Sequence, residues 1–97
     1  MTTEELLQAI LKAAKDGVTW LDLSGKNLTA LPPEIGQLTN LSTLYLHNSQ
    51  LTSLPAEIGQ FTNLSTLDLR SNQLTSLPAE IGQLTKYNSP LIGVGNR

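Results

Sequence analysis

The chain has 97 residues, a formal net charge of −2 and no cysteine. This length allows one domain with a modest core. The lack of cysteine excludes disulfides, thiolate zinc sites and thiol nucleophiles. No basic run is present, which argues against nucleic acid and membrane surfaces as partners. No apolar run approaches the roughly 20 residues of a membrane span, and the N-terminal segment is unlike a secretory signal. We therefore expect a soluble, cytoplasmic protein.

Residues 1–17 predict an amphipathic helix. The segment Thr2-Thr3-Glu4-Glu5 is a capping box, and Gly17 suits the left-handed position that ends a helix. The apolar residues between them fall on one face at helical spacing: Leu6, Leu7, Ile10, Leu11 and Ala14. We expect this helix to cap the core that follows; docking into the groove of a partner is the alternative.

Residues 18–86 consist of three 23-residue units. The segments 41–63 and 64–86 differ at six of 23 positions, and 18–40 keeps the same apolar skeleton. Each L-x-L pair alternates with polar residues, which predicts a short strand with one buried face. The P-x-E-I-G segment predicts a loose helical turn ended by its glycine. One unit cannot bury its leucines alone, so the units must stack with their strands in a parallel sheet.

This pattern resembles the leucine-rich-repeat family, and within it the 23-residue class of intracellular Ras-associated and bacterial Roco-type repeats. The resemblance covers Val18 to Lys86. It implies an α/β fold: a short right-handed solenoid with three parallel strands, an N-terminal capping helix and a concave face that recognises protein. One departure concerns the asparagine that the family uses to hydrogen-bond its inner loops. Lys26, Ser49 and Asn72 occupy that position. Serine can do part of the task, whereas lysine must point to water.

Residues 87–97 depart from the repeat, because a 23-residue register places Tyr87, Pro90 and Ile92 at leucine positions. We expect an irregular tail rather than a fourth repeat. Two arrangements remain open. The tail is a partial cap in which Pro90 blocks further strand addition, or it is loose and leaves the last turn partly covered. The second arrangement favours self-association through a set of C-terminal residues: Leu67, Leu69, Leu74, Leu77, Tyr87 and Leu91.

The residues offer no catalytic, cofactor-binding or metal-binding constellation. His47 is the only histidine, and we expect it beside Arg70 rather than between an acid and a hydroxyl. We therefore predict a protein that is not an enzyme and has no cofactor. The outward strand positions form three columns: Trp20, Thr43 and Thr66; Asp22, Tyr45 and Asp68; Ser24, His47 and Arg70. The second and third repeats differ mostly in these columns and at position 8 of the 23-residue unit, which is Gly25, Asn48 and Ser71. This variation indicates either an adjustable binding face or drift at unconstrained positions.

Within these columns Tyr45, with His47 and Arg70 beside it, resembles a small binding hot spot; a solvated tyrosine is the alternative. Trp20 either joins that patch or packs on the capping helix. Asp22 and Asp68 lie two strands apart, about 9–10 Å at the usual strand spacing, and we expect both to be solvated charges.

Two functional hypotheses follow. The first is a protein-interaction module that binds a protein or peptide on its concave face. The second is a self-associating structural solenoid, a homodimer formed through the C-terminal repeat. Three short strands offer much less than the ~800 Å² per partner of a standard interface, so we expect a single copy to bind weakly.

Overall fold

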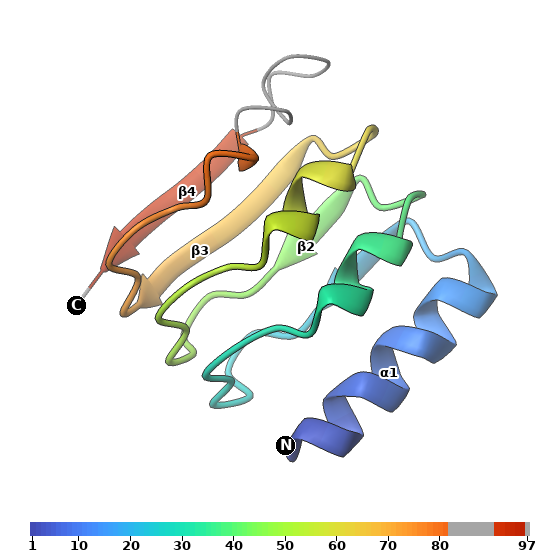
Figure 1. The fold of residues 1–97 in the computed structure, drawn as a ribbon, viewed down its shortest axis with the longest axis horizontal. Helices are drawn as coiled ribbons and strands as arrows, with labels where there is room; N and C mark the ends of the chain where they lie inside the picture. Colours follow the sequence, from blue (N-terminus) through green and yellow to red (C-terminus); the bar gives the residue numbers. More distant parts are fainter. Residues whose placement is uncertain (82–90, 97) are drawn as a thin grey trace.

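The computed structural model describes residues 1–81 and 91–96. In chain order its elements are α1 (Thr3–Asp16), β1 (Trp20–Asp22), η1 (Pro33–Gln37), β2 (Thr43–Tyr45), η2 (Ala56–Gln60), β3 (Thr66–Asn72) and β4 (Leu91–Asn96), where η denotes a 3₁₀ turn. The strands form one parallel sheet in the order β1-β2-β3-β4. Figure 1 shows the η turns on one side of the sheet and α1 beside η1 at the N-terminal end of the stack.

The first three strands pair one repeat length apart. Leu21 pairs with Leu44, and Leu44 pairs with Leu67. The buried apolar residues form one continuous cluster, which contains most of the repeated leucines, Ile35 and Ile58 of the η turns, Phe61, and Leu6, Ile10 and Ala13 of α1. The predicted stacking of 23-residue units and the predicted α/β solenoid are confirmed. Each unit supplies one strand and one turn to a shared core that none could form alone.

Helix α1 begins with the predicted capping box, in which Thr2 and Glu5 each bond the other's backbone N–H. It ends at Gly17, whose φ is 64°. The buried residues of α1 are Leu6, Ile10 and Ala13, at spacings of four and three. Leu11 was expected on this buried face and is instead 36% exposed. The buried face of α1 is therefore narrower than its pattern of apolar residues predicts.

We expected the glycine of each P-x-E-I-G segment to end the turn, and in the first two segments it does not; Gly82 of the third segment lies outside the described residues. Gly36 and Gly59 lie inside η1 and η2. A Cβ atom built on Gly59 would lie 2.7 Å from the backbone oxygen of Glu80, and one on Gly36 would lie 3.0 Å from that of Glu57. Glycine is needed here because successive turns approach each other too closely for any side chain.

Residues 91–96 form a fourth strand, where we had expected an irregular tail and a three-stranded sheet. Leu67 pairs with Ile92 and Leu69 with Val94, an offset of 25 residues rather than 23. Ile92 and Val94 therefore pair where the leucines of a fourth repeat would have paired, but they lie two residues later in the chain than the 23-residue period predicts. Main-chain pairing tolerates this shift because it depends on backbone groups rather than on leucine itself. Tyr87 and Pro90, on which the cap hypothesis rested, lie outside the described residues.

Candidate functional site

The outward positions of β1, β2 and β3 lie side by side, as predicted. Trp20 pairs with Thr43 and Thr43 with Thr66. In the next column Asp22 pairs with Tyr45 and Tyr45 with Asp68. We call this surface the strand face and define it by eight residues: Trp20, Asp22, Thr43, Tyr45, His47, Thr66, Asp68 and Arg70.

Trp20 is 59% exposed. This exposure disfavours the alternative in which the indole packs on the capping helix. Trp20 alternates with Leu21, which packs against the core, so its side chain lies on the outward side of β1. It is thus part of the strand face.

Asp68 is not the solvated charge we expected, because the residue is only 8% exposed. The Arg70 guanidinium donates two hydrogen bonds to its carboxylate, from Nε to Oδ1 at 2.9 Å and from Nη2 to Oδ2 at 2.7 Å. The backbone N–H of Arg70 also donates to Oδ1 at 3.2 Å. These bonds outweigh the effect of burial and lower the pKa of Asp68. Such a two-point contact fixes the orientation of both side chains.

His47 lies against this pair, next to an acid, whereas we had expected it beside Arg70 alone. Its Nδ1 is 3.4 Å from Asp68 Oδ2. That nitrogen is buried and has no hydrogen-bond partner. The contact is an ion pair only when the imidazole is protonated. The Tyr45 ring meets the imidazole edge to face, with centroids 5.9 Å apart and planes at 77°. Tyr45, His47, Asp68 and Arg70 therefore form one connected cluster across β2 and β3.

Asp22 repeats the local geometry of Asp68 on β1 and is exposed. Its Oδ1 accepts hydrogen bonds from the backbone N–H of Ser24, at 2.9 Å, and from the Ser24 hydroxyl. These bonds lower the pKa of Asp22. Both aspartates stand two residues before their donor, the spacing of an Asx turn.

Position 8 of each repeat has a left-handed backbone, a constraint that the sequence analysis missed. The φ angles are 67° at Gly25, 57° at Asn48 and 59° at Ser71. Glycine and asparagine are the residues that adopt this conformation most readily, and their presence in two repeats was the available signal. Variation at position 8 is therefore not free: the backbone limits it.

The inner-loop hydrogen bonds explain why asparagine occurs in only one repeat. Asn72 Oδ1 accepts from Leu51 N–H at 3.0 Å, and its amide donates to Leu46 O at 2.9 Å. Ser49 performs the accepting half of this task for Leu28 N–H, at 3.0 Å, as predicted for serine. The two bonds from Leu28 and Leu51 N–H each join residues 21 apart in neighbouring units. Lys26 belongs to the first unit, which follows α1 rather than another repeat.

The predicted self-association residues are largely unavailable. Leu67, Leu69 and Leu74 are buried, and Leu77 is 39% exposed. Leu91 pairs with Thr66 in the sheet, and Tyr87 lies outside the described residues. The edge of β3, which the loose-tail arrangement would leave open, is occupied by β4.

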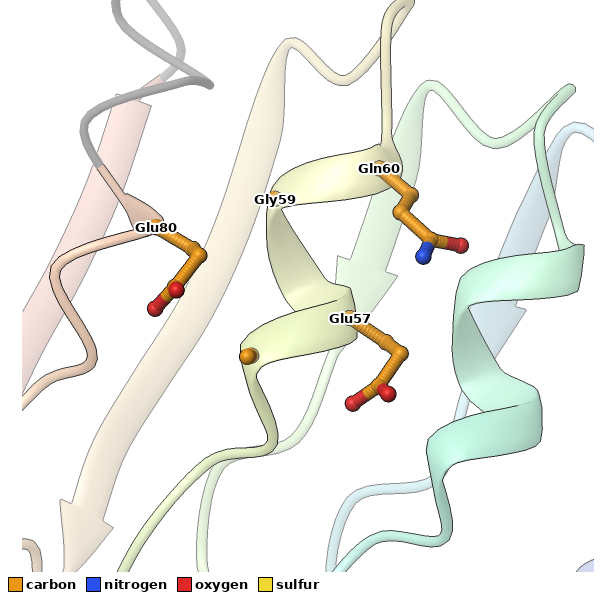
Figure 2. A pocket seen from close by; sticks show the side chains of 5 residues that line it. Glu57, Gly59, Gln60 and Glu80 are labelled. Atoms are coloured by element: carbon orange, nitrogen blue, oxygen red, sulfur yellow. The ribbon is translucent and has the colours of Figure 1, made fainter.

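The turns on the opposite side of the molecule enclose a shallow hollow of about 280 Å³, lined by Ala56, Glu57, Gly59, Gln60 and Glu80. Figure 2 shows Glu80 extending toward η2, whereas Glu57 extends away from Glu80 toward η1. The two carboxylates do not converge. Among residues 1–81 and 91–96, no three histidine, aspartate or glutamate side chains gather to hold a metal. No helix of this described part is long and apolar enough to cross a membrane.

Comparison with known proteins identifies the repeats. A family model described as a leucine-rich repeat region matches residues 18–88. No curated protein matches the chain. A solved structure of a leucine-rich-repeat protein from Leptospira interrogans is similar, with 49% sequence identity and a TM-score of 0.72. The match covers 79% of this chain and 19% of that one, so the chain spans about a fifth of that relative's length.

Proposed function

Because the chain belongs to the leucine-rich-repeat family, we propose that it is a non-enzymatic module that binds a protein or peptide on its strand face. Leucine-rich-repeat domains generally mediate protein–protein interaction. The observation that supports this face is the cluster on β2 and β3. Arg70 is held by Asp68 while 65% of its side chain stays exposed, and Tyr45 is braced by His47.

Such bracing favours binding because side chains that are already ordered lose little conformational entropy when a partner arrives. Tyrosine, tryptophan and arginine are also the residue types most often found at interface hot spots. Trp20, Tyr45 and Arg70 supply all three, one from each of the first three strands. They lie on a diagonal across the sheet, because each stands two residues further along its strand than the one before.

The size of the face limits the affinity. The three strands that carry the face span about 10 Å at the usual spacing, which leaves the area well below that of a standard interface. We therefore propose a short linear segment as the partner, rather than a large folded surface.

A random peptide library selected on the whole chain tests this proposal. The selected peptides are titrated into ¹⁵N-labelled protein and the amide shifts are mapped. We expect the largest shifts on the strand face, with little change around Glu34 and Glu57 on the η turns. Peptides that bind to the η turns or to α1 instead would contradict the proposal.

A homodimer is the second candidate function, and one observation favours it. Within the described part of the chain, β4 pairs with β3 alone and ends the sheet. An edge strand offers backbone donors and acceptors to another copy. Self-association would then run through β4 rather than through the buried leucines of β3. Sedimentation at several concentrations tests this; a monomer at the highest concentration rejects it.

A further inference from the structure

The charges of the strand face do not balance at every point. On β3, Asp68 and Arg70 neutralise each other through two hydrogen bonds. On β1, Asp22 is exposed, and no cation of the described part of the chain lies within ion-pair distance of it. His47 and, more weakly, Lys26 attract Asp22 from a longer distance. One end of the face therefore carries a negative charge that no ion pair neutralises.

The Asp22 carboxylate is also presented in a fixed orientation. Both hydrogen bonds from Ser24 end on Oδ1, and no described residue donates one to Oδ2. The same bonds keep the group ionised by lowering its pKa. A fixed, ionised and exposed carboxylate is the element that a guanidinium or ammonium group pairs with.

Two aromatic side chains flank this carboxylate. Trp20 is two residues away on the same outward side of β1, about 6.6 Å along the strand. Tyr45 is the register partner of Asp22 on β2, about 4.8 Å across the sheet. Aromatic faces attract cations, and tryptophan does so most strongly. Trp20 is the most exposed large apolar residue of the described chain.

From this arrangement we infer that Trp20, Asp22 and Tyr45 form a site for a cationic side chain, an arginine or lysine of the bound peptide. The cation lies against Asp22 Oδ2 and over the two aromatic rings. At the far side of the face the carboxylate of Asp68 is already paired with Arg70 and offers no free negative charge, so the peptide's cation is directed to Asp22 at the β1 end. This inference rests on the proposed function and adds the chemistry of the partner.

The probe is a blocked tripeptide, N-acetyl-Gly-Arg-Gly amide, compared with its citrulline analogue. Citrulline has nearly the shape of arginine and no charge. The chain has one tryptophan, so a single indole N–H resonance reports on the site. We expect the arginine peptide to shift this resonance saturably and the citrulline peptide to bind about threefold or more weakly, as loss of a cation–π contact and an exposed ion pair implies.

Asp22→Asn keeps an Oδ1 acceptor for Ser24 while removing the charge, and we expect it to reduce affinity for the arginine peptide about threefold. Trp20→Ala should have a similar effect, followed through the backbone amide resonances of β1 because this variant lacks the indole signal. Glu57→Gln, on the opposite side of the molecule, is the matched control and should leave the affinity unchanged. Equal binding of the two tripeptides, no binding of either, or an Asp22→Asn protein that binds as the wild type does, would overturn the inference.

The library peptides separate this inference from the proposed function. If they map to the strand face, are rich in arginine or lysine, and bind Asp22→Asn more weakly, both stand. If they map to the strand face, lack basic residues and bind Asp22→Asn as tightly as the wild type, the cation site is wrong and the proposed function stands. If they map elsewhere while the arginine tripeptide still shifts Trp20, the cation site stands and the proposed function is wrong.

Discussion

Arg70 lies across the carboxylate of Asp68 on the same strand, joined to it by hydrogen bonds of 2.9 and 2.7 Å. This pair makes stability depend on pH. Because the folded-state pKa of Asp68 is lowered, its stabilisation is complete above the unfolded pKa of about 3.9 and is lost as the pH falls through the folded value. Between pH 6 and pH 3, the free energy of unfolding in urea should fall more for the wild type than for Asp68→Asn. Glu57→Gln, at a carboxylate on η2 far from this pair, serves as the control. Identical pH profiles for wild type and Asp68→Asn would show that the pair contributes nothing.

The left-handed backbone at position 8 predicts one stabilising and one destabilising substitution. Ser71→Gly should raise the free energy of unfolding by roughly 0.5–1 kcal/mol, because glycine adopts a φ of 59° without steric cost. Gly25→Ala should lower it by about 1 kcal/mol. A Cβ on Gly25 meets nothing within 4 Å, so that cost is purely conformational. Urea unfolding measures both. A Ser71→Gly protein less stable than the wild type contradicts the backbone assignment.

The close approach of successive turns makes Gly59 sensitive to the smallest addition. Gly59→Ala should destabilise the protein by about 1–3 kcal/mol, since the new methyl would lie 2.7 Å from the backbone oxygen of Glu80. Gln60→Ala, one residue later and exposed, should change stability by less than about 0.5 kcal/mol. Thermal unfolding of the two variants compares them directly. Equal melting temperatures would mean that the turns are not packed this tightly.

The inner-loop hydrogen bonds predict that alanine substitutions at position 9 differ in how much they destabilise the protein. Asn72→Ala leaves a buried N–H and two buried carbonyls without their partner, which should cost about 2–4 kcal/mol. Ser49→Ala removes a single bond, to Leu28 N–H, and should cost about 1 kcal/mol. Lys26→Ala should be neutral, because no earlier repeat depends on that position. Denaturant unfolding orders the three variants, and a Lys26→Ala protein as unstable as Asn72→Ala would contradict this explanation.

Most of the fold could be predicted because the signal is periodic. Leucines at fixed intervals of 23 residues dictate the strands and their register, and local capping chemistry dictates the ends of α1 at Thr2 and Gly17. Strand β4 was missed because its apolar pair, Ile92 and Val94, falls two residues outside that period. Strand pairing depends on backbone groups and does not require the 23-residue period, whereas the prediction of strands from the sequence rested on that period.

The chemistry of the strand face was harder to predict because it depends on neighbours. The columns followed from alternation alone. The burial of Asp68 depends on the guanidinium of Arg70 and on the imidazole of His47, which lies just after β2. The spacing of the strands alone does not reveal these contacts. The role of Gly59 depends likewise on a turn more than 20 residues later, which local rules for glycine cannot anticipate.

The affinity of a strand-face peptide for wild-type protein and for Tyr45→Ala tests the central claim most directly. Isothermal titration with a library-selected peptide should show about a tenfold or greater loss on Tyr45→Ala, the scale expected of an interface hot spot. The melting temperature should stay close to that of the wild type, and Glu57→Ala should bind normally. An unchanged affinity for Tyr45→Ala, with the fold intact, would contradict the claim that the strand face is the binding surface.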